Sequence, residues 1–256
     1  MALSRKLSYL AAAAATQWLP RNVIEARQLR ALKSMLAFCE ASVPLYRESF
    51  RRAGVRAADL RSLEDLSRFP TLTREQVVAA YPDGILSRRP TPKDVVFRTS
   101  GTSGLFMEIA YSEEANDWLD AVYARALFST GYRPWDRFAY FWWEAQDKPR
   151  RVYERAGLMK KQYLPLDPDP RVQLEALRRL KPTFIYNFPS VMMMLARIVE
   201  SEGLGELAPR GIICHGELMP KEIQQGIARA FRCPVYNQYG AQEFNRMAWD
   251  CDRHES

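Results

Sequence analysis

The sequence predicts an α/β fold in which a mixed or parallel β-sheet is flanked by helices. Three observations support this class. The chain has 256 residues, of which 47% are hydrophobic, so it can bury a full core. Its C-terminal part alternates segments of helical periodicity with short apolar segments, which is typical of crossover units on a parallel sheet. Its middle part holds a segment rich in glycine and hydroxyl groups between two predicted strands.

The N-terminal part is expected to be helical. Apolar residues recur at helical spacing over 17–41 and predict a long helix there, with Pro44 beyond its end. A short helix is predicted over 60–67, and Thr73 is placed to cap another that runs to Ala80. Prolines then interrupt the chain, so 82–92 is predicted to be a loop.

The middle of the chain is expected to contain strands and one helix. An apolar segment before residue 99 and an alternating segment over 105–111 predict two strands. Ser112 is a good N-cap for a helix that runs to about Thr130 and ends at Gly131. The continuous apolar segment over 138–143 predicts a buried strand.

The C-terminal part predicts three helix–strand pairs. The helices are expected over 171–180, 190–201 and 220–231, and the strands over 183–187, 211–215 and 235–238. Ligands bind at the carboxyl ends of strands in such sheets, so the segments after the strands are the places for a site. These segments are Asn187-Phe188-Pro189-Ser190, Cys214-His215-Gly216-Glu217 and Tyr239-Gly240-Ala241-Gln242-Glu243.

Charge and cysteine content restrict the class of protein. The net charge is +7, but the arginines and lysines are scattered as pairs among acidic residues, which favours solvated helix faces over nucleic-acid binding. The four cysteines lie far apart and form no disulfide framework, so we expect a reducing, cytoplasmic environment. The first twenty residues resemble a secretion signal in composition but continue into a helical pattern, and no segment is long and apolar enough to span a membrane.

The segment TSGTSG is suited to binding phosphate. Glycines let the backbone approach a ligand closely, and successive N–H groups and hydroxyls donate hydrogen bonds to phosphate oxygens. It is not a P-loop, because no Gly-Lys-Ser/Thr follows. The alternative is an ordinary hairpin turn. The segment consists of Thr99, Ser100, Gly101, Thr102, Ser103 and Gly104.

The segment YGAQE provides a second candidate. A carboxylate after a tight turn at a strand end is a suitable ligand for Mg²⁺, which prefers a few hard oxygens together with nucleotide phosphates. The neighbouring aromatic ring offers a face for a purine base. The alternative is a turn with a solvated glutamate.

Together, in this order, these segments resemble the adenylate-forming superfamily and, within it, the phenylacetate–CoA ligase-like branch, which includes coenzyme F390 synthetase and proteins associated with capsule biosynthesis. TSGTSG is similar to the family's T-S-G-T-T-G, YGAQE to its Y-G-x-S/T-E, and Gly216-Glu217 to its Gly-Glu element. The similarity runs from about residue 30 to the end. Weaker similarities are VPLYR at 43–47, FPTLTR at 69–74, FPS at 188–190 and AWDC at 248–251.

The resemblance implies roles for individual residues. The TSGTSG segment would hold the phosphates of ATP, with Thr102 counted among the catalytic residues. Gly216 and Glu217 would line the adenine side, Tyr239 would stack on adenine beside Gly240 and Gln242, and Glu243 would hold Mg²⁺. The chain differs from the family at Leu105-Phe106, where Gly-x-Pro is usual, and at Gln242, where a hydroxyl is usual. The acid substrate is expected near Asn187, Phe188 and Tyr140.

The implied reaction is attack of a small-molecule carboxylic acid on the α-phosphate of ATP, followed by acyl transfer to coenzyme A or another nucleophile. Region 1–90 would be the N-terminal helical part of the large domain, and 91–256 its nucleotide-binding part. Family members continue to a ribose-binding aspartate, a hinge and a small domain with the catalytic lysine. The sequence ends at Ser256, before these elements, so the resemblance implies an incomplete catalytic cycle. A homodimer or a partner that supplies the missing region is one expectation; the alternative is a non-catalytic nucleotide-binding or interaction module.

A zinc site is not favoured by the sequence. Cys251 and His254, with Cys214 and His215, contain the right residue types, but their spacing is not diagnostic. Met192, Met193 and Met194 and the aromatic segment 140–143 are either core residues or the lining of an acyl pocket. The acid, the acceptor and the pathway (aromatic degradation, a surface glycan or antibiotic tailoring) stay open.

Overall fold

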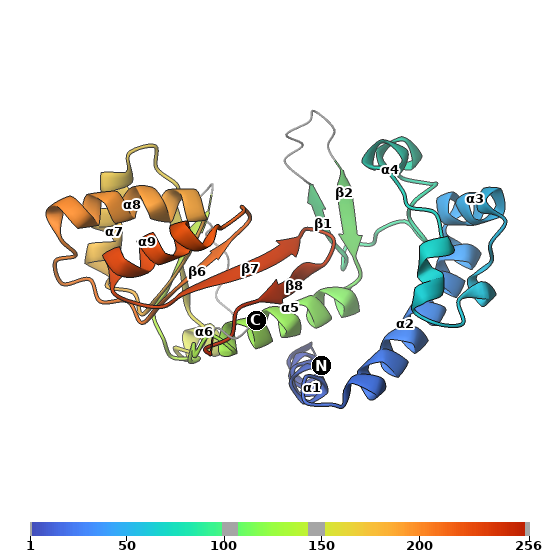
Figure 1. Cartoon of the computed structure of the whole chain (residues 1–256), viewed down its shortest axis with the longest axis horizontal. Coiled ribbons are helices and arrows are strands. Elements are labelled where there is room, and N and C mark those ends of the chain that lie inside the picture. The colour runs from blue at the N-terminus through green and yellow to red at the C-terminus, as the bar shows by residue number, and fades with distance from the viewer. Residues whose placement is uncertain (1, 99–106, 143–151, 254–256) are drawn as a thin grey trace. The chain divides into compact units, whose positions relative to one another are not determined.

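The computed structural model describes residues 2–98, 107–142 and 152–253. The chain divides into two compact units, Met1–Ala121 and Val122–Ser256. We describe each unit by itself. The predicted α/β fold is confirmed: helices dominate the first unit, and the second contains a mixed, mostly parallel sheet with helices packed against it (Figure 1).

The first unit is built from helices around a small apolar core. Phe50 is almost fully buried at the centre of this core and its ring lies 5.2 Å from that of Phe69. The predicted cap at Thr73 is confirmed, because its hydroxyl accepts a hydrogen bond from the backbone N–H of Gln76. The helices are α1 (Ala2–Thr16), α2 (Arg21–Ser42), α3 (Pro44–Ala53), η1 (Ala57–Asp59), η2 (Glu64–Arg68) and α4 (Arg74–Ala80).

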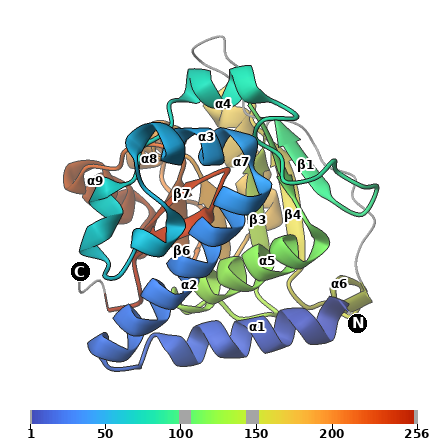
Figure 2. The same cartoon turned by 90° about the vertical axis from the view of Figure 1, so that its right-hand side faces the viewer.

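Helix α1 is held by ion pairs to the first turns of α5 (Glu113–Phe128), beside which it runs in Figure 2. Asp117 of α5 is only 3% exposed and is paired with both Arg5 and Lys6. The N-terminal residues that resemble a secretion signal are therefore part of the folded unit. The predicted cap of α5 is confirmed, since the Ser112 hydroxyl accepts from the N–H of Ala115 at 3.1 Å.

Strands β1 (Val95–Arg98) and β2 (Glu108–Tyr111) form a two-stranded antiparallel sheet. They confirm the two strands predicted on either side of TSGTSG. Residues 99–106, and so Thr99, Ser100, Gly101, Thr102, Ser103 and Gly104, lie outside the described residues. Their predicted contact with phosphate stays a prediction.

The sheet of the second unit has six strands in the order β4-β3-β5-β6-β7-β8. The first five are parallel, and β8 is antiparallel to β7. The bounds are β3 (Phe138–Trp142), β4 (Lys161–Pro165), β5 (Phe184–Asn187), β6 (Gly211–His215), β7 (Val235–Ala241) and β8 (Asn245–Trp249). The helices of this unit are α6 (Val152–Arg155), α7 (Pro170–Leu180), α8 (Pro189–Glu202) and α9 (Lys221–Phe231), together with the end of α5.

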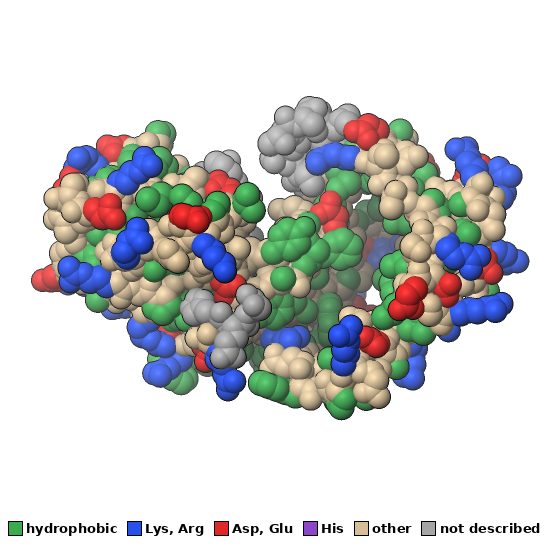
Figure 3. Space-filling model, in the orientation of Figure 1, with side chains coloured by type: hydrophobic (Ala, Val, Ile, Leu, Met, Phe, Trp, Pro, Cys, Tyr) green, Lys and Arg blue, Asp and Glu red, His purple; other side chains and the backbone are tan. Residues whose placement is uncertain are grey.

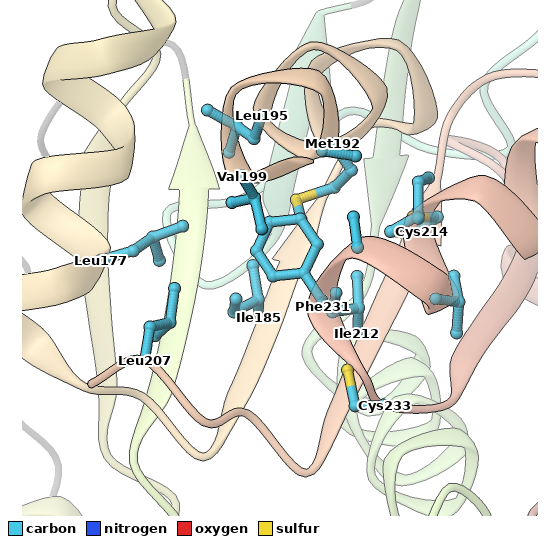
Figure 4. Close-up of a cluster of buried hydrophobic side chains, with 14 of the residues drawn as sticks. Leu177, Ile185, Met192, Leu195, Val199, Leu207, Ile212, Cys214, Phe231 and Cys233 are labelled. Carbon is cyan, nitrogen blue, oxygen red and sulfur yellow. The ribbon is translucent and has the colours of Figure 1, made fainter. Parts of the chain in front are cut away.

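The two faces of this sheet carry different cores. Ile185 and Ile212 point to the face covered by α7, α8 and α9, where they join a large aliphatic cluster with Phe231 (Figure 4). Their neighbours Tyr186 and Ile213 point to the opposite face and pack with Leu127 of α5 in a cluster rich in aromatic rings. Since side chains alternate along a strand, each apolar strand contributes side chains to both cores.

Several elements were not predicted from the sequence. Helix α3 begins at Pro44, because proline is favoured in the first turn of a helix, and α1, α6, β4 and β8 were also missed. The prediction that the strand after α9 ends at Gln238 was wrong, since β7 continues to Ala241 as one arm of a hairpin with β8. Tyr239 and Gly240 are therefore strand residues, and the turn itself comprises Gln242, Glu243 and Phe244.

Candidate functional site

The strand order of the second unit identifies one edge of the sheet as the expected ligand site. From β3 the chain continues to β4 on one side, whereas β5 lies on the other side of β3. The connections thus change direction between β3 and β5. In open α/β sheets, ligands bind outside the carboxyl ends of the strands at such a switch point.

Asn187 ends β5 at this edge. It is fully buried, and its Oδ1 accepts a hydrogen bond from the N–H of Phe188 at 2.8 Å. Because a backbone N–H can only donate, this bond fixes the orientation of the amide and leaves the Nδ2 group as a donor on the other side. Nδ2 is buried without a hydrogen-bond partner in the described part of the chain.

Gly216 and Glu217 follow β6. Gly216 has a φ of +78°, and a Cβ at this position would lie 2.9 Å from the ring of Phe188, so both conformation and space require glycine. The carboxylate of Glu217 accepts hydrogen bonds of 2.9 Å from both the N–H and the hydroxyl of Ser190, in the first turn of α8. An anion is stabilised at that end of a helix, so Glu217 joins the end of β6 to the start of α8.

The β7–β8 hairpin presents the YGAQE residues. Tyr239 is 65% exposed, and Glu243 is exposed in the turn, where it forms no ion pair with the described residues. A Cβ on Gly240 would lie 1.9 Å from the carbonyl oxygen of Asn245, so glycine permits the close approach of the two strands. A single free carboxylate in an exposed turn fits the way in which Mg²⁺ is held by one or two carboxylates and substrate phosphates.

Aromatic side chains line the α5 face of the sheet beneath this edge. The ring of Tyr186 stacks on that of Tyr140 at 4.6 Å and on that of His215 at 4.1 Å. The ring of Phe188 also packs against His215, with 4.8 Å between the ring centres. Burial lowers the pKa of His215 to about 3, with a smaller contribution from the charge of Arg246. At neutral pH the imidazole is therefore uncharged, and one of its nitrogens is a donor and the other an acceptor.

Arg246 of β8 extends across this aromatic face. Its Nε donates to Oε1 of Gln238 at 2.8 Å, its Nη1 to Oδ1 of Asn245 at 2.8 Å, and its Nη2 to the hydroxyl of Tyr186. The guanidinium carbon lies 5.0 Å from the ring centre of Tyr123 and 5.5 Å from that of Tyr186. All of these partners are neutral.

Three polar groups in successive strands lack hydrogen-bond partners within the described ranges. They are Nδ2 of Asn187 in β5, Nε2 of His215 in β6 and Nε2 of Gln238 in β7, and all three atoms are buried. His215 and Gln238 are neighbours in the register of β6 and β7. A buried polar group without a partner costs about 1–3 kcal/mol. Side-chain alternation places His215 and Gln238 on the same face as Tyr186, whereas Asn187 lies on the opposite face with Ile185 and Cys214. The two neighbouring groups of His215 and Gln238 therefore point to a ligand on the Tyr186 face that completes the bonding.

The structure brings most of the predicted site residues to one unit. Asn187, Phe188, Gly216 and Glu217 lie at the ends of β5 and β6, and Tyr140 of β3 stacks on Tyr186 of β5. Tyr239, Gly240, Gln242 and Glu243 lie on the β7–β8 hairpin. The positions of these residues do not test the role predicted for each side chain, so the roles stay predictions.

The zinc residues are only partly described. Cys251 is a half-buried free thiol, while His254 lies outside the described ranges. In the part of the chain that the structure covers, no group of three or more His, Cys, Asp and Glu side chains is placed to hold a metal ion. Cys214 is buried, and burial raises the pKa of its thiol well above the usual range.

Sequence reasoning missed the polar side chains beneath the edge. His215 was named within the segment after the second of the three predicted C-terminal strands but was given an individual role only in the zinc hypothesis, and Tyr186, Gln238 and Arg246 were given no role. Alternation along β5 and β6 could have placed Tyr186 and His215 on one face. No pattern in the sequence indicates that Arg246 reaches from β8 to Tyr186 in β5.

The methionines of α8 lie in two different surroundings, and the prediction of an acyl pocket is not tested by them. Met192 is fully buried in the aliphatic core. Met193 and Met194 line a surface pocket of about 320 Å³ with Arg197, Leu218 and Ile223, on the side of the sheet away from Tyr186. They do not contact the aromatic residues beneath the strand edge.

Two properties bear on the class of partner. No helix within the described residues is long and apolar enough to cross a membrane. On the face drawn in Figure 3, basic and acidic side chains are interspersed.

Comparison with known proteins confirms the resemblance found in the sequence. The chain is 28% identical over 233 residues to the phenylacetate–coenzyme A ligase of Pseudomonas putida, an alignment that covers 87% of this chain and 52% of that protein. It is 34% identical over 119 residues to the phenylacetate–coenzyme A ligase of Thermus thermophilus, with coverage of 45% and 26%. The chain thus spans about half the length of the first relative. No protein-family model matches it.

Solved structures confirm the fold. A 2-hydroxyisobutyryl-CoA ligase in complex with 2-HIB-AMP and CoA superposes with a TM-score of 0.73 over 92% of this chain and 53% of that chain, at 21% identity. The same ligase in its postadenylation state superposes with a TM-score of 0.72 at 20% identity. The described fold is therefore that of a part of the acyl-CoA ligases that form adenylates.

Proposed function

We propose that this chain binds an acyl-adenylate and takes part in the ATP-dependent activation of a carboxylic acid for transfer to coenzyme A. The observation that carries the proposal is the carboxyl edge of the second unit. There β5 and β6 end in buried polar groups without partners in the described chain, Gln238 of β7 adds another, and the YGAQE hairpin follows. The relatives named as CoA ligases and the superposition on an adenylate-bound ligase support it.

In the proposed reaction, a carboxylate oxygen attacks the α-phosphorus of ATP, and the bond to pyrophosphate breaks. The thiolate of coenzyme A then attacks the acyl carbon and displaces AMP. The protein contributes position and neutralisation of phosphate charge, as is usual for transfer at phosphorus. Glu243 would hold Mg²⁺, which supplies part of this neutralisation, and Tyr239 would stack on the adenine.

Binding of a stable adenylate analogue tests the proposal. We would titrate phenylacetyl-sulfamoyl-adenosine, in which a sulfamoyl group replaces the phosphate, into the protein by calorimetry. Stacking on an aromatic side chain is worth about 1–3 kcal/mol per base, so Tyr239→Ala should weaken binding by about 5- to 150-fold. Phe244→Ala is the matched control, because Phe244 is 64% exposed in the same hairpin and has no assigned role.

Glu243→Gln separates the metal from the nucleoside. We expect it to weaken Mg·ATP binding and to leave binding of the acyl-sulfamoyl analogue unchanged, since that analogue lacks the pyrophosphate that Mg²⁺ accompanies. Equal binding of Mg·ATP by the Glu243→Gln variant and the parent chain would refute the role of Glu243, and absence of binding of both ligands by the parent chain would refute the proposed function.

A nucleotide-binding module without catalysis is the second candidate, and exchange of radiolabelled pyrophosphate into ATP distinguishes the two. Exchange that depends on added carboxylic acids supports the enzyme. Analogue binding without exchange over a broad panel of acids supports the module.

A further inference from the structure

Arg246 carries a positive charge that no described carboxylate balances. Its three hydrogen bonds go to the neutral oxygens of Gln238, Asn245 and Tyr186, and no ion pair involves it within the described ranges. The side chain is half-buried against aromatic rings. The rings attract the cation but bring no negative charge, so the guanidinium keeps an unbalanced charge and two N–H groups that are not used in these bonds.

The neighbours of Arg246 add a directed donor and a second polar group to the same face. Arginine can only donate, so its bond to Oε1 of Gln238 fixes that amide with the Nε2 group turned away from the guanidinium. Gln238 is 2% exposed, and Nε2 has no partner among the described residues. Nε2 of His215, the register neighbour of Gln238, is also buried without a partner.

The course of the Arg246 side chain places these groups below the strand ends. The Cα of Arg246 pairs with Gly240 in the hairpin. From there the side chain runs back to Gln238, two positions earlier in β7, and across to Tyr186, which precedes the last residue of β5. The guanidinium of Arg246 therefore lies further from the turn that holds Glu243 than the backbone of Arg246 does. A group bound to Arg246 lies deeper than a phosphate bound near Glu243.

We propose that Arg246, together with Gln238 and His215, binds a second carboxylate on the acid substrate, so that the chain selects dicarboxylic acids. This inference rests on the proposed function. The distal carboxylate accepts hydrogen bonds from the free N–H groups of Arg246 and from the Gln238 amide and balances the charge of the guanidinium. The first carboxylate is the one activated at the level of the YGAQE turn. A monocarboxylic acid of equal size leaves Arg246 unbalanced and the buried donors without partners.

Two matched pairs of acyl-sulfamoyl-adenosine analogues test this inference by calorimetry. The first pair carries 4-carboxyphenylacetyl or 4-nitrophenylacetyl, which differ in charge but hardly in shape. The second carries glutaryl or pentanoyl. Charge-assisted bonds to a desolvated arginine lead us to expect that the carboxylated member of at least one pair binds about 10- to 100-fold more tightly.

Variants of Arg246 identify the group responsible. Arg246→Met removes the charge with similar volume and should abolish the preference within the pair, while Arg246→Lys should retain part of it. Arg179→Met is the control, because Arg179 is an exposed arginine of α7 with no ion pair or hydrogen bond to a described residue. Thermal unfolding establishes that each variant is folded.

Three results would overturn the inference. One is equal or tighter binding, in both pairs, of the analogue whose acyl group lacks the carboxylate. Another is a preference for the carboxylated member that persists in Arg246→Met. The third is absence of binding for all four analogues, which would overturn the proposed function as well; binding of the uncharged analogues alone would overturn only the dicarboxylate inference.

Discussion

His215 should make the stability of the protein depend on pH between about 3 and 6.5. Its imidazole packs against the rings of Tyr186 and Phe188, and burial, followed by the charge of Arg246, lowers its pKa to about 3. The pKa of histidine in the unfolded chain is about 6.5. Between these two values the unfolded chain binds a proton that the folded chain does not, so stability falls as the pH falls below 6.5.

The size of the effect follows from this difference in pKa. At about pH 7.5 both states are almost entirely neutral at this position, so the contribution is near zero. At about pH 5 the unfolded state is protonated in roughly 97% of molecules and the folded state in about 1%. The resulting loss is RT ln(33), or about 2 kcal/mol, which is a large fraction of the stability of a typical domain. The loss grows as the pH falls further, to about 4 kcal/mol near pH 3, and levels off at about 5 kcal/mol once the folded state is protonated as well.

Urea unfolding followed by tryptophan fluorescence measures this loss. Histidine at 215 would be compared with His215→Phe, which retains a ring against Tyr186, and with His215→Gln, which retains polarity. Subtracting each variant cancels the titration of all other groups. Between about pH 7.5 and pH 5, we expect the unfolding free energy of the parent chain to fall by about 2 kcal/mol more than that of either variant. A difference that stays constant to within a few tenths of a kcal/mol would refute the burial of a neutral His215.

Three further substitutions test particular contacts. Gly240→Ala should disrupt the β7–β8 hairpin, because its Cβ would collide with the carbonyl of Asn245, and the circular dichroism melting temperature should fall by several degrees. Glu217→Ala removes both acceptors for Ser190 in the first turn of α8 and should cost about 0.5–2 kcal/mol in urea unfolding, whereas Glu217→Asp or Glu217→Gln should cost less. Asp117→Ala removes the buried partner of two basic residues in α1, and limited proteolysis should then cleave α1 several-fold faster; an unchanged cleavage rate would contradict the role of these ion pairs.

Much of the fold could be predicted because its signals are local. The caps at Thr73 and Ser112 each depend on a hydroxyl and an N–H three residues later, and both were predicted correctly. The alternation of helices and strands in the second unit likewise depends on short periodic segments. Strands β4 and β8 were missed because they are short and partly exposed, with Lys161 and Arg246 among their residues, and their stability comes from pairing with β3 and β7.

The residues expected to bind the nucleotide could be predicted from the sequence, whereas those inferred to bind the acid could not. Gly240 and Glu243 lie in one contiguous motif, so a short sequence match places them together. The contact between Arg246 and Tyr186 joins residues 60 positions apart, and it depends on the order β5-β6-β7-β8, which no local pattern fixes. The residues expected to bind the nucleotide were therefore visible in the sequence, whereas those inferred to select the acid were found only from the fold.

The buried polar groups beneath the strand edge have a cost that folding alone does not explain. A leucine at position 238 or a phenylalanine at 215 would fill similar space, keep contact with Tyr186 and leave no donor without a partner. Together, two such polar groups cost about 2–6 kcal/mol, comparable with a large part of the net stability of a domain. The half-buried charge of Arg246 beside them adds to that cost. A bound anion removes all three penalties at once. The substrate should therefore stabilise this protein more than it would stabilise a site whose polar groups already had partners.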